Sequence, residues 1–279
     1  MTEFPKLALG TWLMGGTKEA DPNNDDAKDI AAIKLAIDNN ITLIDTAQNY
    51  ANGRCEELVG EAVNDHPRDG FQILTKQNKN RLSYQNVLDD CEASMKRLGV
   101  DFIDYFLCHA PNTEYDMKDF FRASNKLYAQ GKIKNVGVSN FGPRMLKIAV
   151  EASETPIVVN QVHFALDDDD VLSTGTYDFC REHNIAVQAY RTLVDLDANK
   201  SALNIIDDIA AKLGISRQQV AIAYINSFPG IVFTVRSSTQ RHWDEIKSAL
   251  KIKLDGDDIN KLRNSHKNIQ GSLRHFLEV

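Results

Sequence analysis

Eight short apolar runs recur along the chain, and longer amphipathic stretches separate them. Each run is too short for a helix, and most are rich in β-branched or aromatic residues, so each predicts a buried strand. The alternation predicts a parallel sheet with helical crossovers, and eight strands in 279 residues favour a (β/α)8 TIM barrel. The runs are Lys6–Leu9, Ile41–Ile44, Gln72–Leu74, Phe102–Leu107, Val136–Val138, Ile157–Val159, Ala186–Ala189 and Ile231–Val235.

The stretches between the runs have helical periodicity, and a doubly wound open sheet is the structural alternative to a barrel. The first run is followed by Gly10-Thr11-Trp12 rather than by a GxGxxG turn, so the sequence favours the barrel. No composition shift or internal repeat marks a boundary, so residues 1–279 are predicted to form one domain. One helical face is predicted at Tyr84, Val87, Leu88, Cys91, Met95 and Leu98.

The formal net charge of −7 argues against a nucleic-acid partner, which needs a basic surface. No apolar run approaches the ~18 residues of a membrane span, and the first ten residues show no signal-peptide pattern. The cysteines fit neither a zinc site nor a disulfide framework, which predicts reduced thiols in a cytoplasmic protein. The acidic run Asp167–Asp170 predicts a solvated helix start rather than a metal site.

Polar residues follow the predicted strands, where the active site of such a barrel lies. Asp45 and then Tyr50 follow the second run, Lys76 follows the third and His109 follows the fourth. We expect these side chains to meet at one mouth of the barrel. Further polar residues at later strand ends are Ser139, Asn140, Asn160, Gln161, Tyr190, Arg191, Arg236, Ser237 and Ser238.

The set holds one Tyr, one Lys, one Asp and one His. In such a set the Tyr can donate a proton to a carbonyl oxygen while hydride reaches the carbon. A phenol titrates near ~10, and a neighbouring ammonium such as Lys76 lowers that value, with Asp45 holding the lysine. His109 would hydrogen-bond the substrate oxygen. The set contains neither a metal-ligand cluster nor a nucleophile elbow, so no metal is predicted and a barrel hydrolase or isomerase is disfavoured.

These motifs resemble the aldo-keto reductase family over nearly the whole chain, as a member with short loops of the bacterial type. Ile44-Asp45-Thr46-Ala47-Gln48-Asn49-Tyr50 looks like its Asp and Tyr signature. Leu74-Thr75-Lys76 and Asp104-Tyr105-Phe106-Leu107-Cys108-His109 look like its lysine and histidine strands. Gly137-Val138-Ser139-Asn140-Phe141, Asn160-Gln161 and Ala189-Tyr190 are similar to its nicotinamide-binding segments.

The resemblance implies a (β/α)8 barrel enzyme that uses NADPH/NADP+ and reduces aldehydes and ketones. Tyr50 would be the proton donor, and Asp45, Lys76 and His109 would complete the tetrad. Substrate would meet Trp12, Tyr50, His109 and Ala110. Cofactor contacts are expected from Gly10, Thr11, Trp12, Asp45, Ser139, Asn140, Gln161, Tyr190, Arg191, Leu193, Arg236, Ser237, Ser238, His242 and Glu245.

The last loop departs from the family pattern where relatives grip the adenosine 2′-phosphate. Arg236 can bind phosphate in a bidentate way, but His242 is a weaker cation than the usual Arg, and Ile246 cannot hydrogen-bond adenine. We expect NADPH to be preferred over NADH. Arg191 replaces a common Ser, and its cation lies either near the pyrophosphate or on the surface.

The substrate side predicts an open and permissive site. Ala110 stands where relatives often carry Trp, and the segments Pro111–Met117, Leu193–Ser201 and Ser265–Val279 are short. Trp12, Tyr50 and His109 would line what remains of the pocket, with Leu13 as a further candidate. We expect broad activity on small aldehydes and ketones. The alternative is a cofactor-binding regulatory subunit with little turnover. A monomer is expected, with a weak dimer as the other possibility.

Overall fold

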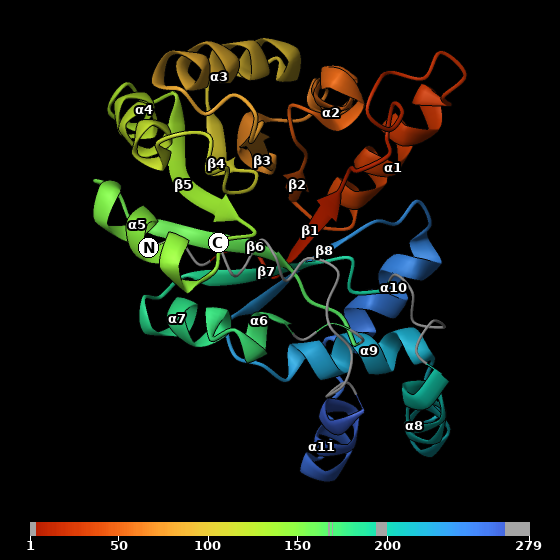
Figure 1. Cartoon of the computed structure of the whole chain (residues 1–279). Helices are drawn as coiled ribbons and strands as arrows, with labels where there is room; N and C mark the ends of the chain where they lie inside the picture. The colour runs from red at the N-terminus through yellow and green to blue at the C-terminus, as the bar shows by residue number, and fades with distance from the viewer. Residues whose placement is uncertain (1–3, 167, 169, 194–199, 266–279) are drawn as a thin grey trace.

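A closed barrel of eight parallel strands forms the centre of the computed structural model, which describes residues 4–166, 168, 170–193 and 200–265 (Figure 1). Strands that are neighbours in the chain pair in the barrel, and β1 pairs with β8 to close it. This confirms the predicted (β/α)8 barrel and excludes the open sheet. The strands are β1 (Leu7–Gly10), β2 (Leu43–Asp45), β3 (Gln72–Gln77), β4 (Ile103–Cys108), β5 (Ile133–Ser139), β6 (Ile157–His163), β7 (Ala186–Tyr190) and β8 (Ile231–Val235).

Each of the eight predicted runs contains a strand, although Ile41 and Thr42 lie outside β2, and several strands continue beyond the apolar residues. β3 continues through Lys76, which pairs with Leu107, and β6 continues through Gln161, which pairs with Gln188. The polar residues still form the ladder hydrogen bonds of a parallel sheet, so the strand does not end where hydrophobicity ends. Several candidate site residues therefore lie within strands rather than in the loops that follow.

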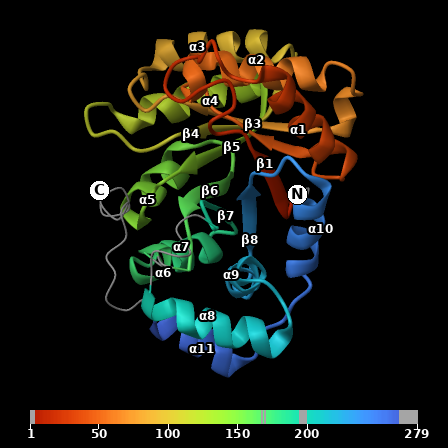
Figure 2. The same ribbon diagram turned by 90° about the vertical axis from the view of Figure 1, so that its right-hand side faces the viewer.

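Helices surround the barrel as an outer ring, as expected for alternating strands and helices (Figures 1 and 2). The predicted helical face in α3 is largely confirmed, because Val87, Leu88, Cys91 and Leu98 are buried. The helices are α1 (Asp26–Asp38), α2 (Arg54–Val63), α3 (Tyr84–Leu98), α4 (Met117–Ala129), α5 (Pro143–Ala152), α6 (Asp170–Ser173), α7 (Thr176–Glu182), α8 (Lys200–Leu213), α9 (Arg217–Asn226), α10 (Gln240–Ala249) and α11 (Gly256–Asn264), with 3-10 turns η1 (Tyr50–Gly53) and η2 (Arg68–Gly70).

The apolar core has two parts. A large part fills the space between the strands and the helices, and a small part fills the barrel interior. The rings of Phe4 and Tyr105 meet edge to face at 4.8 Å, so the short N-terminal segment contributes to the interior. The buried residues of the interior part are Ala8, Leu43, Leu74, Tyr105, Leu107 and Val159.

The strand period of two places a polar layer directly above this interior cluster. Leu43 is followed two residues later by Asp45, Leu74 by Lys76, Leu107 by His109 and Val159 by Gln161. Residues two apart in a strand point to the same face. The barrel interior is therefore apolar at the amino ends of the strands and polar at the carboxyl ends, where a site can form.

The acidic run differs from its prediction as a solvated helix start. Asp170 begins α6, but Asp168 and Asp170 are each only 5 % exposed. Asp168 accepts a hydrogen bond at 2.7 Å from Nδ1 of His163, which explains how a carboxylate is buried there. Residues 167 and 169 lie outside the described residues.

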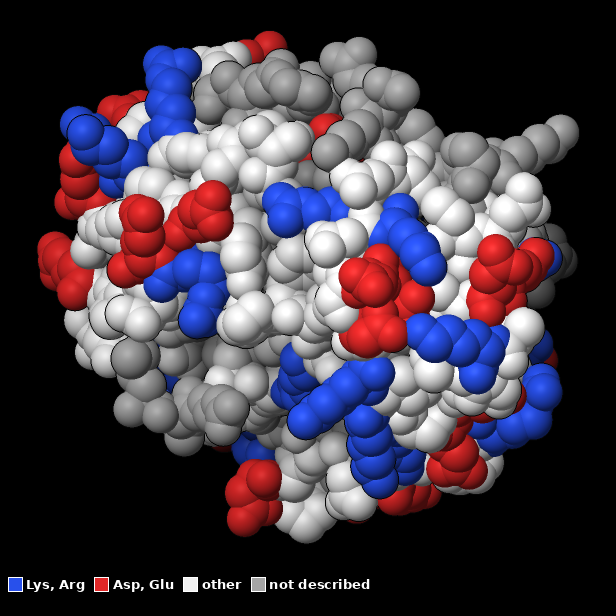
Figure 3. Space-filling model, turned by 90° about the horizontal axis from the view of Figure 1, so that it is seen from below, with Lys and Arg blue, Asp and Glu red and all other residues white. Residues whose placement is uncertain are grey.

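All four cysteines are buried and unpaired, as predicted for reduced thiols. On the face seen in Figure 3, acidic and basic side chains are interspersed rather than gathered into one field. Within the described ranges, no helix combines the length and the apolar character that crossing a membrane requires.

Candidate active site

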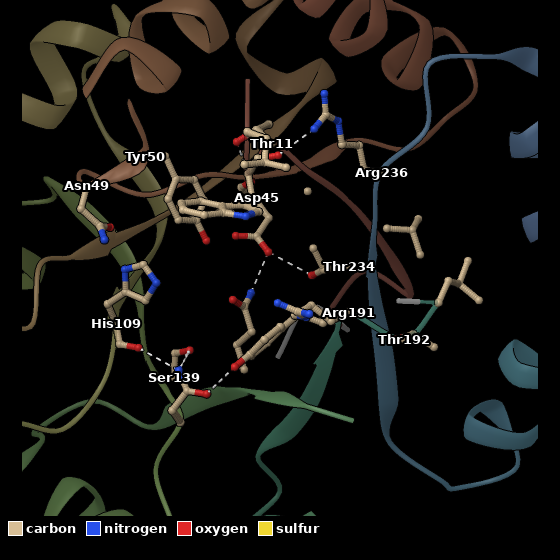
Figure 4. Close-up of a pocket in the computed structure, with 18 residues that line it drawn as sticks. Thr11, Asp45, Asn49, Tyr50, His109, Ser139, Arg191, Thr192, Thr234 and Arg236 are labelled. Carbon is tan, nitrogen blue, oxygen red and sulfur yellow. Dashed lines mark hydrogen bonds between the residues drawn. The ribbon is translucent and has the colours of Figure 1, made fainter. Parts of the chain in front are cut away.

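A cavity of about 570 Å³ opens at the carboxyl ends of the strands. Its walls come from strand ends far apart in the sequence, as expected for a barrel of this type. Figure 4 shows Asn49 and His109 on one side of Asp45, with Arg236 and Thr192 on the other. The lining residues are Gly10, Thr11, Trp12, Leu13, Asp45, Asn49, Tyr50, His109, Ser139, Asn140, Gln161, Tyr190, Arg191, Thr192, Leu193, Thr234, Val235 and Arg236.

A buried hydrogen-bonded chain joins Asp45, Lys76 and Tyr50 at the floor of the cavity. The Lys76 ammonium donates to the Asp45 carboxylate and, at 2.8 Å, to the carbonyl of Thr46. Its third neighbour is the Tyr50 hydroxyl at 3.4 Å. Lys76 has no exposed surface, so these three oxygens replace the water that an ammonium otherwise binds.

The surroundings keep Lys76 charged and Tyr50 protonated. Burial alone would lower the pKa of Lys76, but the Asp45 carboxylate and Tyr50 outweigh it and raise that pKa. Burial raises the pKa of Tyr50, and the opposing effect of Lys76 is the smaller one. The sequence predicts that Lys76 lowers the pKa of this phenol, and it does, but the net direction is upward because water is excluded.

A tight turn presents Tyr50 to the cavity. Ala51 and Asn52 have φ of 47° and 52°, and Gly53 follows with φ of 93°, so three consecutive residues are left-handed. The Tyr50 ring lies between Trp12, at 4.8 Å between ring centroids, and His109, at 5.7 Å. The turn separates Tyr50 from the start of α2, and the two rings hold its phenol beside the cavity.

The His109 ring lies edge to face with the Tyr50 ring, and the imidazole is uncharged at neutral pH. Burial, with Lys76 and Lys79 nearby, lowers the pKa of His109 to about 3. Its backbone N–H donates to the carbonyl of Gln77 at 3.2 Å. A neutral imidazole can donate one hydrogen bond to a substrate oxygen without competing as an acid.

Side-chain amides gather beyond the tetrad. The Asn140 Nδ2 donates to the His109 carbonyl at 3.1 Å, and its Oδ1 accepts from the Tyr190 hydroxyl at 2.9 Å. Gln161 donates through Nε2 to Asp45 at 2.7 Å. Ser139 is buried beside Asn140, which has φ of 60°. Amides and a hydroxyl beside an aromatic ring fit the carboxamide and ring of a nicotinamide.

The other end of the cavity offers groups suited to phosphate. Arg236 is exposed, and its Nη1 donates to the Trp12 carbonyl at 3.1 Å, while Nη2 lies 3.8 Å from Asp29. The Thr192 hydroxyl is buried and forms no hydrogen bond in the part of the chain that the structure describes. Arg191 lines the same end in a left-handed conformation. The guanidinium of Arg236 gives this end of the cavity a cation suited to an anionic ligand such as a phosphate.

Comparison with known proteins agrees with this geometry. The sequence model of the aldo/keto reductase family matches residues 6–267. The chain belongs to the aldo/keto reductase family. Among curated relatives, the methylglyoxal reductase of Escherichia coli is 29 % identical over 266 residues, which cover 93 % of this chain and 90 % of that protein.

Solved aldo-keto reductases share the fold over almost the whole chain. A thermostable member in complex with the inhibitor epalrestat has a TM-score of 0.90 and 31 % identity, covering 94 % of this chain and 95 % of the other. A Klebsiella pneumoniae member in complex with NADPH has a TM-score of 0.81 and 28 % identity, covering 97 % and 94 %.

The structure brings most, but not all, of the predicted aldo-keto reductase site residues to the cavity. Lys76 lies beneath the floor. Ala110 is buried, with 4 % exposed, and does not line the cavity. Ser237, Ser238, His242 and Glu245 also lie outside the lining. The short segments Leu193–Ser201 and Ser265–Val279 lie mostly outside the described residues, which do not include 194–199 and 266–279.

The residues of α10 that depart from the family pattern lie away from the cavity. Ile246 is 6 % exposed and packs in the core, so it does not face the cavity. The Nη2 of Arg241 lies 3.1 Å from Nε2 of His242, and Arg241 approaches Glu245 at 3.7 Å. Arg241 therefore contacts both neighbours away from the cavity, whereas Arg236 lines the cavity.

Four lining residues are not among the site residues predicted from the sequence: Asn49, Thr192, Thr234 and Val235. Thr234 carried a signal, because it is a polar residue inside an apolar run and two residues after Val232. Asn49 directly precedes Tyr50, so its place at the margin follows once Tyr50 is in the site. Thr192 and Val235 gave no chemical signal in the sequence.

Proposed function

We propose that this protein is an NADPH-dependent carbonyl reductase in which Tyr50 donates the proton. The observation that carries the proposal is the buried chain from Asp45 through Lys76 to a protonated Tyr50 that lines the cavity. A charged lysine beneath a phenol stabilises the phenolate that remains after the proton leaves. This arrangement suits proton donation to an oxygen that gains negative charge.

Tyr50, His109 and Lys76 would have separate roles in the reduction of the carbonyl group. Tyr50 and His109 would hold the carbonyl oxygen, with neutral His109 donating a hydrogen bond. Bound NADPH supplies hydride to the carbonyl carbon. Tyr50 then gives its hydroxyl proton to the oxygen, and Lys76 stabilises the phenolate, which later recovers a proton.

The cofactor assignment rests on the donor set and on the relatives. Ser139, Asn140 and Gln161 would hold the carboxamide, and Tyr190 would stack on the nicotinamide ring. The Klebsiella pneumoniae relative is described in complex with NADPH. Arg236 lies at the opposite end of the cavity from Asn49 and would bind the 2′-phosphate, which favours NADPH over NADH (Figure 4).

The substrates are proposed to be small aldehydes and ketones over a broad range. The rings of Trp12, Tyr50 and His109 supply an apolar wall, and Trp12 is 44 % exposed, so the site opens to solvent. The name of the Escherichia coli relative supports small dicarbonyls such as methylglyoxal as first candidates. We further propose a monomer that acts in the cytoplasm, which gel filtration and cell fractionation would test.

Steady-state turnover of NADPH tests the proposal directly. Wild type and Tyr50→Phe are compared with methylglyoxal, simple aldehydes and ketones, and NADPH affinity is measured separately by fluorescence. We expect Tyr50→Phe to bind NADPH normally and to lose roughly 100-fold or more in kcat, since general acid catalysis contributes about that factor.

Two results would contradict the proposal. Full turnover by Tyr50→Phe would remove Tyr50 from the role of acid. Tight NADPH binding without wild-type turnover on any carbonyl would support the alternative of a cofactor-binding regulatory subunit.

A further inference from the structure

The second oxygen of the Asp45 carboxylate has its own set of donors, separate from Lys76. Lys76 donates to Oδ1, whereas Oδ2 accepts from Gln161 Nε2 at 2.7 Å, from Thr234 Oγ1 at 2.9 Å and from Gln188 Nε2 at 3.4 Å. Asp45 is 2 % exposed, so water has little access to this oxygen. Thr234 and Gln188 play no part in the mechanism described above.

Thr234 and Gln188 also bind each other. Gln188 Nε2 donates to Thr234 Oγ1 at 2.5 Å, which leaves the threonine hydroxyl hydrogen for Asp45. Gln188 is fully buried, and its Oε1 forms no hydrogen bond within the described ranges. Barrel interiors are normally filled by branched apolar side chains. A buried amide with an unsatisfied oxygen is unfavourable unless its N–H groups do something that an apolar residue cannot.

We infer that Thr234 and Gln188 are positioning residues. They hold the Asp45 carboxylate toward Lys76 and thereby keep the ion pair in place beneath the proton donor Tyr50. The inference rests on the reductase function proposed above. Both residues act through Asp45 and touch neither Lys76 nor Tyr50 by a hydrogen bond that the structure records.

The pair makes Asp45 less dependent on Gln161. Gln161 lines the cavity and is the residue expected to hold a carboxamide, so its amide has two tasks. An amide nitrogen carries two hydrogens, and one of them is already on Asp45. If Gln161 turns toward a ligand, Thr234 and Gln188 still satisfy Oδ2, so the ion pair below Tyr50 keeps its geometry.

The effect on Tyr50 has a definite direction. Asp45 raises the pKa of Tyr50, whereas Lys76 lowers it. Removing a donor from Oδ2 leaves more of the carboxylate charge to act on Tyr50, and it lets the carboxylate turn away from Lys76; both changes raise the pKa of the phenol. The titratable groups around Tyr50 come from five elements: Asp45 of β2, Cys55 of α2, Lys76 of β3, His109 after β4 and Tyr190 of β7.

Thr234→Val is the decisive variant because it removes the hydroxyl and keeps the shape. The threonine methyl lies 2.7 Å from where a side chain on Gly10 would begin, so this space is tightly filled and valine retains the contact. Thr234→Ser is the matched control, which keeps the hydroxyl and loses the methyl. The two variants separate hydrogen bonding from packing.

The measurement is the pH dependence of kcat/KM for alcohol oxidation with NADP+, which rises as Tyr50 loses its proton. For Thr234→Val we expect the midpoint to move upward by roughly half a pH unit or more, as for the loss of a hydrogen bond to a charged group. We expect Thr234→Ser to keep the wild-type midpoint. Because Thr234 lines the cavity, the dissociation constant for the cofactor is measured by fluorescence in both variants, and the pH profile is recorded with NADP+ at saturation so that a change in cofactor affinity does not move the midpoint.

An unchanged midpoint in folded Thr234→Val would overturn the inference, and so would an equal shift in Thr234→Ser, which would indicate packing alone. If Thr234→Val does not fold, Gln188→Met removes the other donor and is judged by the same midpoint. Failure of the proposed function is distinguishable, because it appears as absent turnover in the wild type, whereas failure of this inference leaves wild-type turnover intact.

Discussion

The individual side chains of the site are tuned mainly by burial. His109 illustrates the effect, because exclusion of water and two lysines lower its pKa to about 3. In the unfolded chain a histidine titrates near ~6.5. Between these values the unfolded state binds a proton that the folded state does not, so His109 destabilises the fold as the pH falls below about 6.5.

This gives a stability prediction for His109→Gln. Between pH 6.5 and 5, wild type should lose roughly 1–2 kcal/mol of unfolding free energy that the variant retains. Urea unfolding at each pH measures the difference, and the exposed His183→Gln serves as control. Parallel losses in wild type and His109→Gln would show that His109 is charged in the folded protein.

The buried ion pair is a second prediction at this scale. Lys76→Met leaves the Asp45 carboxylate buried without its cation, which should lower the unfolding free energy by about 3 kcal/mol and abolish most turnover. The control is Lys34→Met. The Lys34 ammonium lies 2.7 Å from the Asp65 carboxylate, but that carboxylate is 67 % exposed. That surface pair is open to water and salt, so Lys34→Met should leave the unfolding free energy close to the wild-type value. A similar small loss for both variants would contradict the buried pair.

The four tetrad residues could be predicted because they follow successive apolar runs and have matching chemistry. The net upward pKa of Tyr50 could not, because a sequence shows that Lys76 is present but not how much water is excluded. The hydrogen bonds from Thr234 and Gln188 to Asp45 could not be predicted either. Each is one polar residue inside an apolar run, and only the closed barrel brings them to Asp45.

At the scale of elements, the strand order was predictable and the strand ends were not. The apolar runs located all eight strands, but β3 and β6 continue through polar residues whose partners lie on neighbouring strands. In α10, too, the sequence did not show which residues pack against the barrel. Ile246 could be recognised as unsuited to adenine, but its burial in the core depends on how the helix packs against the barrel.

The connection from β8 to α10 yields a prediction about the cofactor. Arg236→Ala should weaken NADPH binding by roughly 10- to 100-fold, as for loss of a charge-assisted hydrogen bond to phosphate. Affinity for NADH should change little. Arg241→Ala is the control, because its side chain is 77 % exposed on the outside of α10. Both affinities can be measured by fluorescence titration. Equal weakening of NADPH and NADH by Arg236→Ala would contradict a 2′-phosphate contact.

At the scale of the whole molecule, closure of the barrel makes distant parts of the chain depend on one another. β1 pairs with β8, so the amino- and carboxyl-terminal parts of the barrel share one set of hydrogen bonds. The apolar core between strands and helices is continuous from Leu7 to Leu262. The sequence shows no composition boundary and therefore predicts one domain. A single domain with a shared core should unfold in one cooperative transition.

The two tryptophans allow that prediction to be tested. Trp12 lines the cavity and Trp243 is buried in α10, so Trp12→Phe leaves a single reporter on the opposite side of the β1–β8 seam. Fluorescence of Trp243 and far-ultraviolet circular dichroism should give the same midpoint. NADPH at about 100 times its dissociation constant should raise the midpoint temperature by roughly 5–10 °C, because it stabilises the fold by about 2.7 kcal/mol. Both probes should shift together, since the ligand binds the closed barrel. Two separate transitions, or a shift in only one probe, would mean that α10 and the barrel unfold as different units.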